Sequence, residues 1–517
     1  MNKYYLTTPL YYVNAKPHVG HAYTNIIADC MARFKRLEGR DVFLLTGTDE
    51  HGEKIKKIAT ESGEDVEKFV DRFSDNFKKL WEKLNVSYDF FIRTTCDFHK
   101  EVVKKIILSL HQKGDIYRKK YKGYYCIPCE SFWTEFQLKR SAECPDCSRA
   151  VDILEEDNYF FKLSKYQDWL IKYLKSNTDF VRPKTRYNEV LSFLEKNTLE
   201  DLCISRLKKR LSWGIDFPLD DNYVVYVWFD ALANYISGIG FGSNEKKFKS
   251  LWPADIHFMA KDILRHHAIF WPIMLKALDI EPPRVIFAHG WWKFEGEKMS
   301  KTRGNIVNPL DLIAALSKSL SRDDQIAVDA LRYFLLREVP LGLDGTFSWS
   351  ALVNRINSDL ANDLGNLVFR TLNMAEKYLQ GQVCPKDHEL PSEFKESIVG
   401  LDKKYLDRMN RCEFSCALEE VFKFISVMNK YIEDTKPWVL WKENKEDKIK
   451  SFLYSLLEGI RIISLHIYPV MPTVAESINR QLGLDGKPFV LHNKTWANQK
   501  KFRIKKESPL FPRIDVD

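Results

Sequence analysis

Two histidines separated by two residues, His18 and His21, stand where a predicted loop gives way to a predicted helix. The N-terminus of a helix presents backbone N–H groups and the positive end of the helix dipole, and two imidazoles add further donors. Gly20 lies between them and would let a flat purine ring approach the backbone closely. The pattern suits ATP, and the alternative is that both histidines only cap and pack the start of the helix.

A basic run far downstream, Glu297–Asn305, is the second candidate. Lys298 and Lys301 on a polar loop would neutralise a departing pyrophosphate, and Gly296 and Gly304 would supply hinges for its closure. Taken alone, the run is equally compatible with a solvated basic loop.

Gly47 and Gly52 have the four-residue glycine spacing of a P-loop, but Glu53 and Lys54 follow where Gly-Lys-Ser/Thr should continue. A phosphate-binding loop of that type is therefore excluded. The same stretch instead places Asp49 at the carboxyl end of a predicted strand, where its carboxylate would be able to hold an ammonium group.

Four of the ten cysteines form two close pairs, Cys126 with Cys129 and Cys144 with Cys147. Fourteen residues separate the pairs, marginally fewer than the roughly 15–20 usual for a four-cysteine zinc site. Four thiolates leave no open coordination position, so we expect one structural zinc ion that holds its segment together. Two disulfides are the competing interpretation, which a reducing compartment would disfavour.

The elements that must position these groups begin with a strand over residues 3–8 and a loop containing Pro9. A helix follows from about His21, because apolar residues recur there at helical spacing, and residues 41–45 read as the next strand. Strand, helix, strand units of this kind make parallel sheets that bind ligands at the carboxyl ends of their strands. We therefore expect the chemistry in the loops at residues 9–20 and 46–53.

The pattern breaks after about residue 115, in an aromatic, cysteine-rich and charged stretch. Strand-like runs return at 223–229, 256–260 and 284–288, with a helix over about 262–277, and from Trp349 onward the pattern is helical apart from a possible strand near 488–491. The chain divides accordingly into a first catalytic half (1–115), an insertion (116–222), a second catalytic half (223–296), the lysine loop with a linking segment (297–350) and a helical domain (351–517).

Composition adds weaker constraints. Among 517 residues, Lys and Arg exceed Asp and Glu by 79 to 71, a net charge of +8 that permits a polyanionic partner without demanding one. The sequence has no run of about 18 apolar residues and no cleaved targeting peptide, so we expect no membrane span and a cytoplasmic location.

In combination, the two motifs resemble the HIGH and KMSKS signatures of class I aminoacyl-tRNA synthetases, here His18–His21 and Lys298–Thr302. Further blocks across nearly the whole chain look like the methionyl-tRNA synthetase family: Thr7–His21, Asp49–Gly52, Tyr226–Tyr235, Lys261–His267 and Lys436–Trp438. The resemblance implies an α/β fold: a split Rossmann catalytic domain with a zinc-bearing insertion, followed by an all-α anticodon-binding helical bundle.

The resemblance also implies the activity and the site residues. The family activates L-methionine with ATP to methionyl-adenylate and transfers it to the terminal adenosine of initiator and elongator methionine tRNA. The implied catalytic residues are His18, His21, Lys298, Lys301 and Arg206, and the ATP contacts are His18, Gly20, His21, Lys298, Met299, Ser300 and Lys301. The implied methionine pocket is Leu10, Tyr12, Asp49, Trp228, Tyr235, Ile263 and His267.

Several of these assignments have simpler alternatives. Trp228 and Tyr235 could belong to an ordinary core, and Arg206 could form a surface ion pair. Some relatives have proline where this chain has Leu232, which leaves that pocket wall less defined.

In the helical region Asn362, Asn366 and Arg370 recur at four-residue steps and share one helix face. The resemblance assigns them to the anticodon together with Trp438, whose ring would stack on an unpaired base. Solvent exposure of a polar stripe and core packing of Trp438 are the alternatives. A basic run near the end, from Lys494 to Lys506, is either a set of phosphate contacts or a solvated tail.

The implied ligands are methionine tRNA, L-methionine and ATP, with Mg²⁺ accompanying the ATP and one structural Zn²⁺. We expect a monomer, because the chain ends soon after the helical region. Three rivals remain: another class I synthetase, which would usually carry a larger editing insertion, a small-molecule nucleotidyltransferase, which would not need the helical half, and a non-catalytic tRNA-binding relative, which would not need both ATP motifs.

Overall fold

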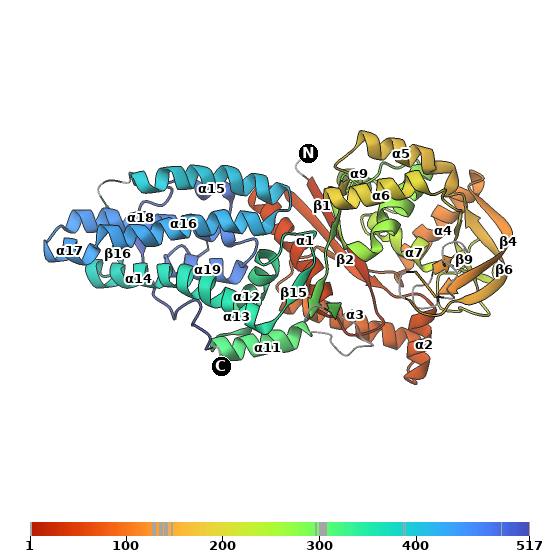
Figure 1. The fold of residues 1–517 in the computed structure, drawn as a ribbon, viewed down its shortest axis with the longest axis horizontal. Helices are drawn as coiled ribbons and strands as arrows, with labels where there is room; N and C mark the ends of the chain where they lie inside the picture. The colour runs from red at the N-terminus through yellow and green to blue at the C-terminus, as the bar shows by residue number, and fades with distance from the viewer. Residues whose placement is uncertain are drawn as a thin grey trace.

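The computed structural model describes residues 3–126, 131–133, 138, 143–145, 148–294, 297–298, 308–385, 387, 389–486 and 489–515. Within them the chain forms two lobes, one built on a parallel sheet and one built of helices (Figure 1).

The first lobe contains a six-stranded sheet in the order β3-β2-β1-β11-β12-β7, in which every neighbouring pair is parallel. Chain order reverses between β1 and β11, and such a reversal opens a ligand crevice at the carboxyl ends of the strands. The predicted parallel sheet is therefore confirmed. Its strands are β1 (Lys3–Tyr12), β2 (Asp41–Asp49), β3 (Phe90–Arg93), β7 (Val181–Arg182), β11 (Ile256–Ala260) and β12 (Ile286–His289).

Helices cover both faces of this sheet. The helix that follows β1 lies between the sheet and the second lobe (Figure 1), and nearly all of its residues are buried. The helices are α1 (Val19–Leu37), α2 (Glu53–Glu61), α3 (Val66–Lys83), α4 (Asp97–Gln112), α5 (Gln167–Ser176), α6 (Lys184–Lys196), α7 (Val227–Leu232), α8 (Asn234–Ser237), α9 (Glu245–Leu251) and α10 (Trp271–Ala277).

The predicted insertion contains a four-stranded antiparallel sheet, β5-β4-β6-β8, at the end of the molecule opposite the helical lobe (Figure 1). Its strands are β4 (Ile116–Cys126), β5 (Ser131–Trp133), β6 (Asp152–Phe161) and β8 (Leu202–Cys203), and β9 (Ser205–Leu207) pairs with β10 (Tyr223–Val225). One strand within the same residue range, β7, instead extends the parallel sheet beside β12. The range 116–222 is therefore interleaved with the catalytic lobe.

A small sheet and two helices connect the lobes: β13 (Trp292–Phe294), β14 (Glu297–Lys298), β15 (Gly345–Phe347), α11 (Pro309–Leu320) and α12 (Asp324–Arg337). The helical lobe comprises α13 (Trp349–Arg355), a π-helical segment (Ile356–Gly365), α14 (Asn366–Leu379), α15 (Ser392–Asn410), α16 (Phe414–Thr435), α17 (Pro437–Lys442), α18 (Glu446–Ile467) and α19 (Pro472–Gln481). The prediction of a strand near 488–491 is wrong for the residues described there, because Leu491–Lys494 is a 3-10 turn. The two-stranded sheet of this region is instead formed by β16 (Gln382–Val383) and β17 (Phe502–Arg503).

Buried charges join the two lobes. Asp29 of α1 forms ion pairs with Arg33 (2.8 Å) and with Arg332 of α12 (2.6 Å). The Arg332 guanidinium also donates to the carbonyls of Val470 (2.8 Å) and Pro469 (3.1 Å). Burial alone would raise the pKa of Asp29, but the two guanidinium groups hold it well below its ordinary value. One continuous buried apolar cluster runs from β1 and α1 through α12 into α15, α16, α18 and α19.

Three local predictions differ from the structure. β1 continues past Pro9 to Tyr12, because a register shift between Thr7 and Leu10 accommodates the missing N–H of the proline. The run 223–229 is a strand only to Val225 and then becomes α7, since a short apolar run does not distinguish a strand from a buried helix.

The helix expected over 262–277 is also interrupted. It begins as a 3-10 turn (Lys261–Ile263), passes through a π-helical segment (His266–Phe270) and ends as α10. Pro272 cannot donate a helical hydrogen bond, which accounts for the wider turn before it.

Candidate active site

Three predicted methionine contacts meet at the carboxyl ends of two adjacent strands. Tyr12 of β1 pairs in register with Asp49 of β2, and Leu10 pairs with Gly47. Because side chains alternate along a strand, Leu10 and Tyr12 share a face, and Asp49 lies beside Tyr12. All three are half-buried. An apolar floor thus borders a carboxylate at the crevice that the sheet topology creates.

Tyr235 and His267 form a hydrogen-bonded pair next to that edge. The Tyr235 hydroxyl lies 2.7 Å from Nε2 of His267, and Nδ1 of His267 lies 2.9 Å from the carbonyl of Ile263. A carbonyl only accepts, so Nδ1 carries the proton and the tyrosine donates to Nε2. Burial lowers the pKa of His267 to about 4, so the imidazole is neutral near pH 7. The pair is a fixed, uncharged wall.

Trp228 is half-buried, in contrast to Tyr235, which is only 1% exposed. Its ring stacks on His266 with 3.7 Å between centroids and meets His267 edge-on at 6.3 Å. Leu10, Tyr12, Trp228 and Ile263 all pack against the buried cluster that contains Tyr235. The core-packing alternative therefore describes the buried Tyr235 and describes the half-buried Trp228 in part.

His18 and His21 cap α1. Nδ1 of His18 accepts from the backbone N–H of Gly20 (3.0 Å), and Nδ1 of His21 accepts from the backbone N–H of His18 (3.2 Å). The two rings stack with centroids 3.7 Å apart. The capping interpretation is thus correct, and contact of the same two side chains with ATP stays a prediction.

Only the start of the lysine loop is described. Lys298 stands in β14 opposite Lys293 of β13, whereas Met299, Ser300 and Lys301 lie outside the described residues. The Nζ of Lys293 (3.2 Å) and the Nζ of Lys261 (2.6 Å) both contact the carboxylate of Asp344. Although burial acts the other way, the Lys261 hydrogen bond and the N–H of Trp291 hold the pKa of Asp344 at about 2. Lys293, on the strand before the loop, therefore belongs to a basic cluster that surrounds the carboxylate of Asp344.

Arg206 of β9 is 3% exposed, so a surface ion pair is excluded. Its guanidinium lies over the ring of Tyr226 (4.3 Å to the centroid) and donates to the carbonyl of Ser205 (2.8 Å). Tyr226 immediately precedes α7, the helix that carries Trp228. The arginine is thus held beside the predicted methionine pocket.

A polar network behind the proposed pocket was not predicted from the sequence. Asp230 of α7 is 1% exposed and accepts from Nδ1 of His51 (2.7 Å) and Nε2 of His99 (2.8 Å). Nδ1 of His99 contacts the hydroxyl of Ser237 (2.7 Å). Burial alone would raise the pKa of Asp230, but both imidazoles hold it below its ordinary value. His51 belongs to a stretch that the motifs singled out, but no local signal identifies its distant partners.

The predicted zinc ligands are only half described. Cys126 and Cys144 are both buried and belong to one small apolar cluster. A turn closes at the second pair, because the N–H of Ser148 donates to the carbonyl of Cys144 (2.8 Å) and the N–H of Cys144 to that of Arg149 (2.7 Å). Cys129 and Cys147 lie outside the described residues, and the rest hold no group of three or more His, Cys, Asp or Glu side chains arranged for a metal ion.

The predicted anticodon residues gather on the helical lobe. Asn362 and Asn366 are exposed, and Arg370 is half-buried and pairs with Glu433 of α16 (2.7 Å). Trp438 is 42% exposed, so its core-packing alternative is wrong. In the part of the chain that the structure describes, every helix is too short or too polar to cross a bilayer.

Comparison with known proteins identifies both lobes. Residues 4–372 match the family model "tRNA synthetases class I (M)", and residues 396–513 match "Anticodon-binding domain of tRNA ligase". Asn362, Asn366 and Arg370 thus fall within the first match and Trp438 within the second.

The relatives agree with these matches. The chain is 48% identical over 520 residues to a methionine–tRNA ligase of Caldanaerobacter subterraneus and 46% identical over 530 residues to one of Clostridium tetani. These alignments cover 99% and 100% of the chain and 79% and 80% of the relatives. The solved structure of Mycobacterium tuberculosis methionyl-tRNA synthetase in complex with methionyl-adenylate superposes with a TM-score of 0.93 at 41% identity, over 99% of this chain and 100% of that one. The chain therefore belongs to the methionine–tRNA ligase family of class I aminoacyl-tRNA synthetases.

Proposed function

We propose that the chain activates L-methionine with ATP and transfers the methionyl group from methionyl-adenylate to the terminal adenosine of methionine tRNA. The observation that carries the proposal is the family match along nearly the whole chain, which includes a relative solved with methionyl-adenylate. Strand register and packing support it, since Tyr12 is paired with Asp49 across β1 and β2, and Leu10, Tyr12, Trp228 and Ile263 pack against one buried cluster.

Methionine binds with its ammonium on Asp49 and its side chain among Leu10, Tyr12, Trp228 and Ile263. Sulfur–ring contacts contribute roughly 0.3–1.5 kcal/mol each, which suits a thioether among aromatic rings. The neutral Tyr235–His267 pair closes the pocket without presenting a charge to the sulfur. Selectivity then comes from an apolar cavity with fixed polar walls.

ATP lies against His18, Gly20 and His21 at the positive end of α1, with Met299 and Ser300 also contributing. The methionine carboxylate attacks the α-phosphorus in line, and Lys298, Lys301 and Arg206 stabilise the charge that develops on pyrophosphate. Mg²⁺ bound with ATP would supply further positive charge to the phosphates. Catalysis is mainly positioning and electrostatics, because no residue needs to form a covalent intermediate.

One Zn²⁺ held by Cys126, Cys129, Cys144 and Cys147 would fix the insertion. Two of these thiols are buried in one cluster and a backbone turn closes at the second pair, which fits a four-thiolate knuckle. Such a site is structural and takes no part in the chemistry.

Asn362, Asn366, Arg370 and Trp438 read the anticodon of the tRNA. Exposure of Trp438 supports this role, because stacking on a base needs an accessible ring face. The proposal also includes the monomeric state and the division of the chain into domains at residues 115, 222, 296 and 350.

The decisive experiment is ATP–pyrophosphate exchange across a panel of amino acids, followed by aminoacylation of a methionine tRNA transcript. We expect exchange with methionine and not with isoleucine or leucine. Asp49→Asn should lower kcat/KM for methionine about 10- to 100-fold, because a hydrogen bond to a charged group contributes about 1.5–3 kcal/mol. Asp41→Asn, at the opposite end of β2 with a 66% exposed side chain, is the matched control. Exchange with another amino acid, or equal behaviour of the two variants, would contradict the proposal.

A further inference from the structure

The short helix α17 lies at the far end of the helical lobe from the parallel sheet (Figure 1). The chain enters it through Lys436, whose backbone is left-handed with φ 47° and ψ 62°, and Pro437 follows in the first turn. Pro437 is buried and Leu440 packs against the main core. The helix is therefore firmly seated on one side.

The opposite side of α17 presents apolar groups to solvent. Trp438, Val439 and Trp441 are 42%, 39% and 42% exposed. Among the described residues, eleven large apolar side chains are exposed to this degree, and three of them stand on this one six-residue helix. Gathered exposed apolar groups mark interaction sites, whereas scattered ones need no explanation.

Trp441 connects this surface to the helix that carries the proposed anticodon residues. Its ring stacks on Tyr378 of α14, with centroids 5.0 Å apart and 28° between planes. The Nζ of Lys377 lies 5.6 Å from the centre of the Tyr378 ring. Asn366 and Arg370 belong to the same helix, and Arg370 pairs with Glu433 of α16, the helix that leads into α17.

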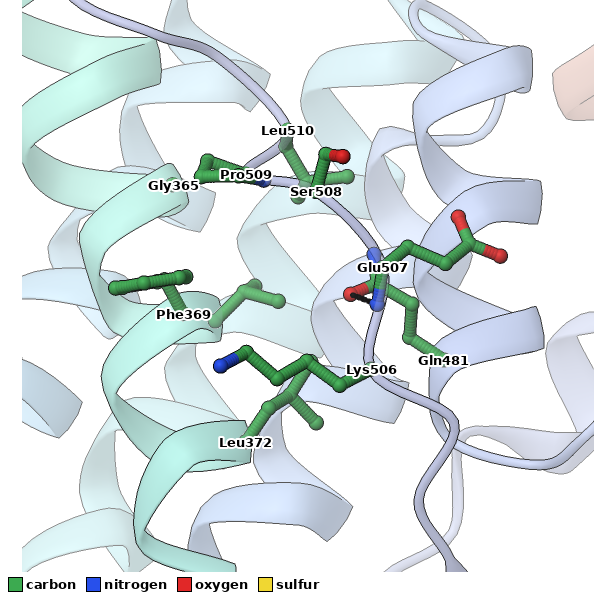
Figure 2. A pocket seen from close by; sticks show the side chains of 10 residues that line it. Gly365, Phe369, Leu372, Gln481, Lys506, Glu507, Ser508, Pro509 and Leu510 are labelled. Atoms are coloured by element: carbon green, nitrogen blue, oxygen red, sulfur yellow. Dashed lines mark hydrogen bonds between the residues drawn. The ribbon is translucent and has the colours of Figure 1, made fainter. Parts of the chain in front are cut away.

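The other flank of α14 carries Phe369, which is 37% exposed. Figure 2 shows the C-terminal segment passing beside this helix, where the Nζ of Lys506 lies 5.4 Å from the centre of the Phe369 ring. Tyr378 lies on a different side of α14 from Phe369, because nine helical residues turn the side chain through about two and a half turns. The α17 side is thus the flank where two exposed indole rings, those of Trp438 and Trp441, stand on one short helix.

Charges near α17 are mixed. Glu433 pairs with Arg370 and Glu443 with Lys445, while Lys436, Lys442 and Asp434 are exposed. A partner recognised through net charge would find little here. A partner with flat, largely uncharged rings on a polyanionic backbone would be able to stack those rings on the two exposed indoles and the tyrosine.

We propose that the Trp441–Tyr378 pair is a second stacking platform, which takes an unpaired base of the tRNA next to the base held by Trp438. The inference rests on the proposed anticodon role of this lobe. Residues 438 and 441 stand about 4.5 Å apart along the helix axis, close to the rise of roughly 3.4 Å per nucleotide in a stacked strand. The rings of Trp438 and Trp441 therefore stack on neighbouring nucleotides of one loop. Stacking on any base is tolerated, because every base has a π-face.

The test measures the Kd of the full-length chain for a methionine tRNA transcript by filter binding. Trp441→Ala should raise Kd about 5- to 100-fold, the range of base–aromatic stacking, without changing the slope of log Kd against log salt. Trp349→Ala is the matched control, because that tryptophan is 40% exposed at the start of α13. Unchanged tRNA affinity in folded Trp441→Ala would overturn the platform.

Two more variants separate stacking from support of α17. Trp441→Leu fills space without a π-face and should weaken binding as Trp441→Ala does, whereas Trp441→Phe should stay within about threefold of the original Kd. Full affinity in Trp441→Leu would overturn the proposal in favour of a packing role. Association of chains that Trp441→Ala abolishes, with tRNA affinity unchanged, would overturn it in favour of self-association.

Trp438→Ala distinguishes failure of this inference from failure of the anticodon proposal. If Trp438→Ala weakens tRNA binding and Trp441→Ala does not, the anticodon role stands and the second platform is refuted. If neither variant affects tRNA binding while methionine-dependent pyrophosphate exchange persists, both assignments to this face are refuted.

Discussion

The proposed methionine pocket and the face of α17 use aromatic side chains in opposite ways. In the pocket, Tyr235 is buried and its hydroxyl is committed to His267, and behind it Asp230 is enclosed by two histidines. On α17, Trp438 and Trp441 are exposed by 42% each. In the first region, the groups proposed to select the amino acid also stabilise the fold. In the second region, the exposed ring surface is not needed for folding.

The difference predicts how each region responds to substitution. A buried polar group costs free energy when its partner is removed, so pocket variants should lose stability and activity together. Exposed rings contribute little to folding, so variants of α17 should lose binding alone. Three experiments on stability test this contrast.

The largest effect is expected for Asp230→Ala. Removal of the carboxylate leaves His51 and His99 buried without their acceptor, which should lower the free energy of unfolding by about 3–5 kcal/mol. Urea denaturation measures the loss, and Asp75→Ala, an acidic residue with a 61% exposed side chain on α3, is the control. A loss below about 1 kcal/mol would show that the network does not support the fold.

A smaller effect is expected from the pH dependence of His267. Its folded pKa of about 4 lies below the ordinary histidine value, so between roughly pH 4 and 6.5 the unfolded chain binds a proton that the folded chain does not. Stability therefore rises with pH across this window, by at most about 1.4 kcal/mol per pH unit for one group. Denaturation of His267→Gln from pH 4.5 to 7 should give a correspondingly shallower slope, and an identical slope would mean that the imidazole titrates alike in both states.

The smallest effect on folding is expected for Trp438→Ala. Because the ring is exposed, the free energy of unfolding should change by no more than about 0.5 kcal/mol. Aminoacylation should nevertheless fall, while tRNA-independent pyrophosphate exchange stays near the original rate. If stability and pyrophosphate exchange fell together in this variant, the proposed difference between the two regions would be wrong.

The sequence predicted what depends on local pattern. The apolar pattern located β11 at Ile256–Ala260 and predicted a helix from about His21, two residues after the observed start of α1 at Val19. It failed where tertiary packing decides between alternatives, as in the change from strand to helix after Val225 and in the continuation of β1 through Pro9.

The candidate site divides in the same way. Motif residues such as Asp49 and Trp228 could be named, because short blocks carry them. The partners that orient the pocket could not: Asp230 meets His99 across 131 residues of sequence, and Asp344 meets Lys261 across 83. Contacts between residues so far apart in the sequence depend on the assembled sheet, so no local spacing of residues predicts them.

The continuous core that crosses from β1 and α1 into α19 bears on how the enzyme is maintained. The molecule has two lobes in outline, but one apolar cluster of the sheet lobe continues into the helical lobe, while a second cluster lies within the sheet lobe. Arg332 links α1 to the turn before α19. Because the shared cluster crosses the junction, local opening there exposes apolar side chains of both lobes at once. A chain opened at this junction therefore presents apolar surface from both lobes, and such surface is prone to aggregation.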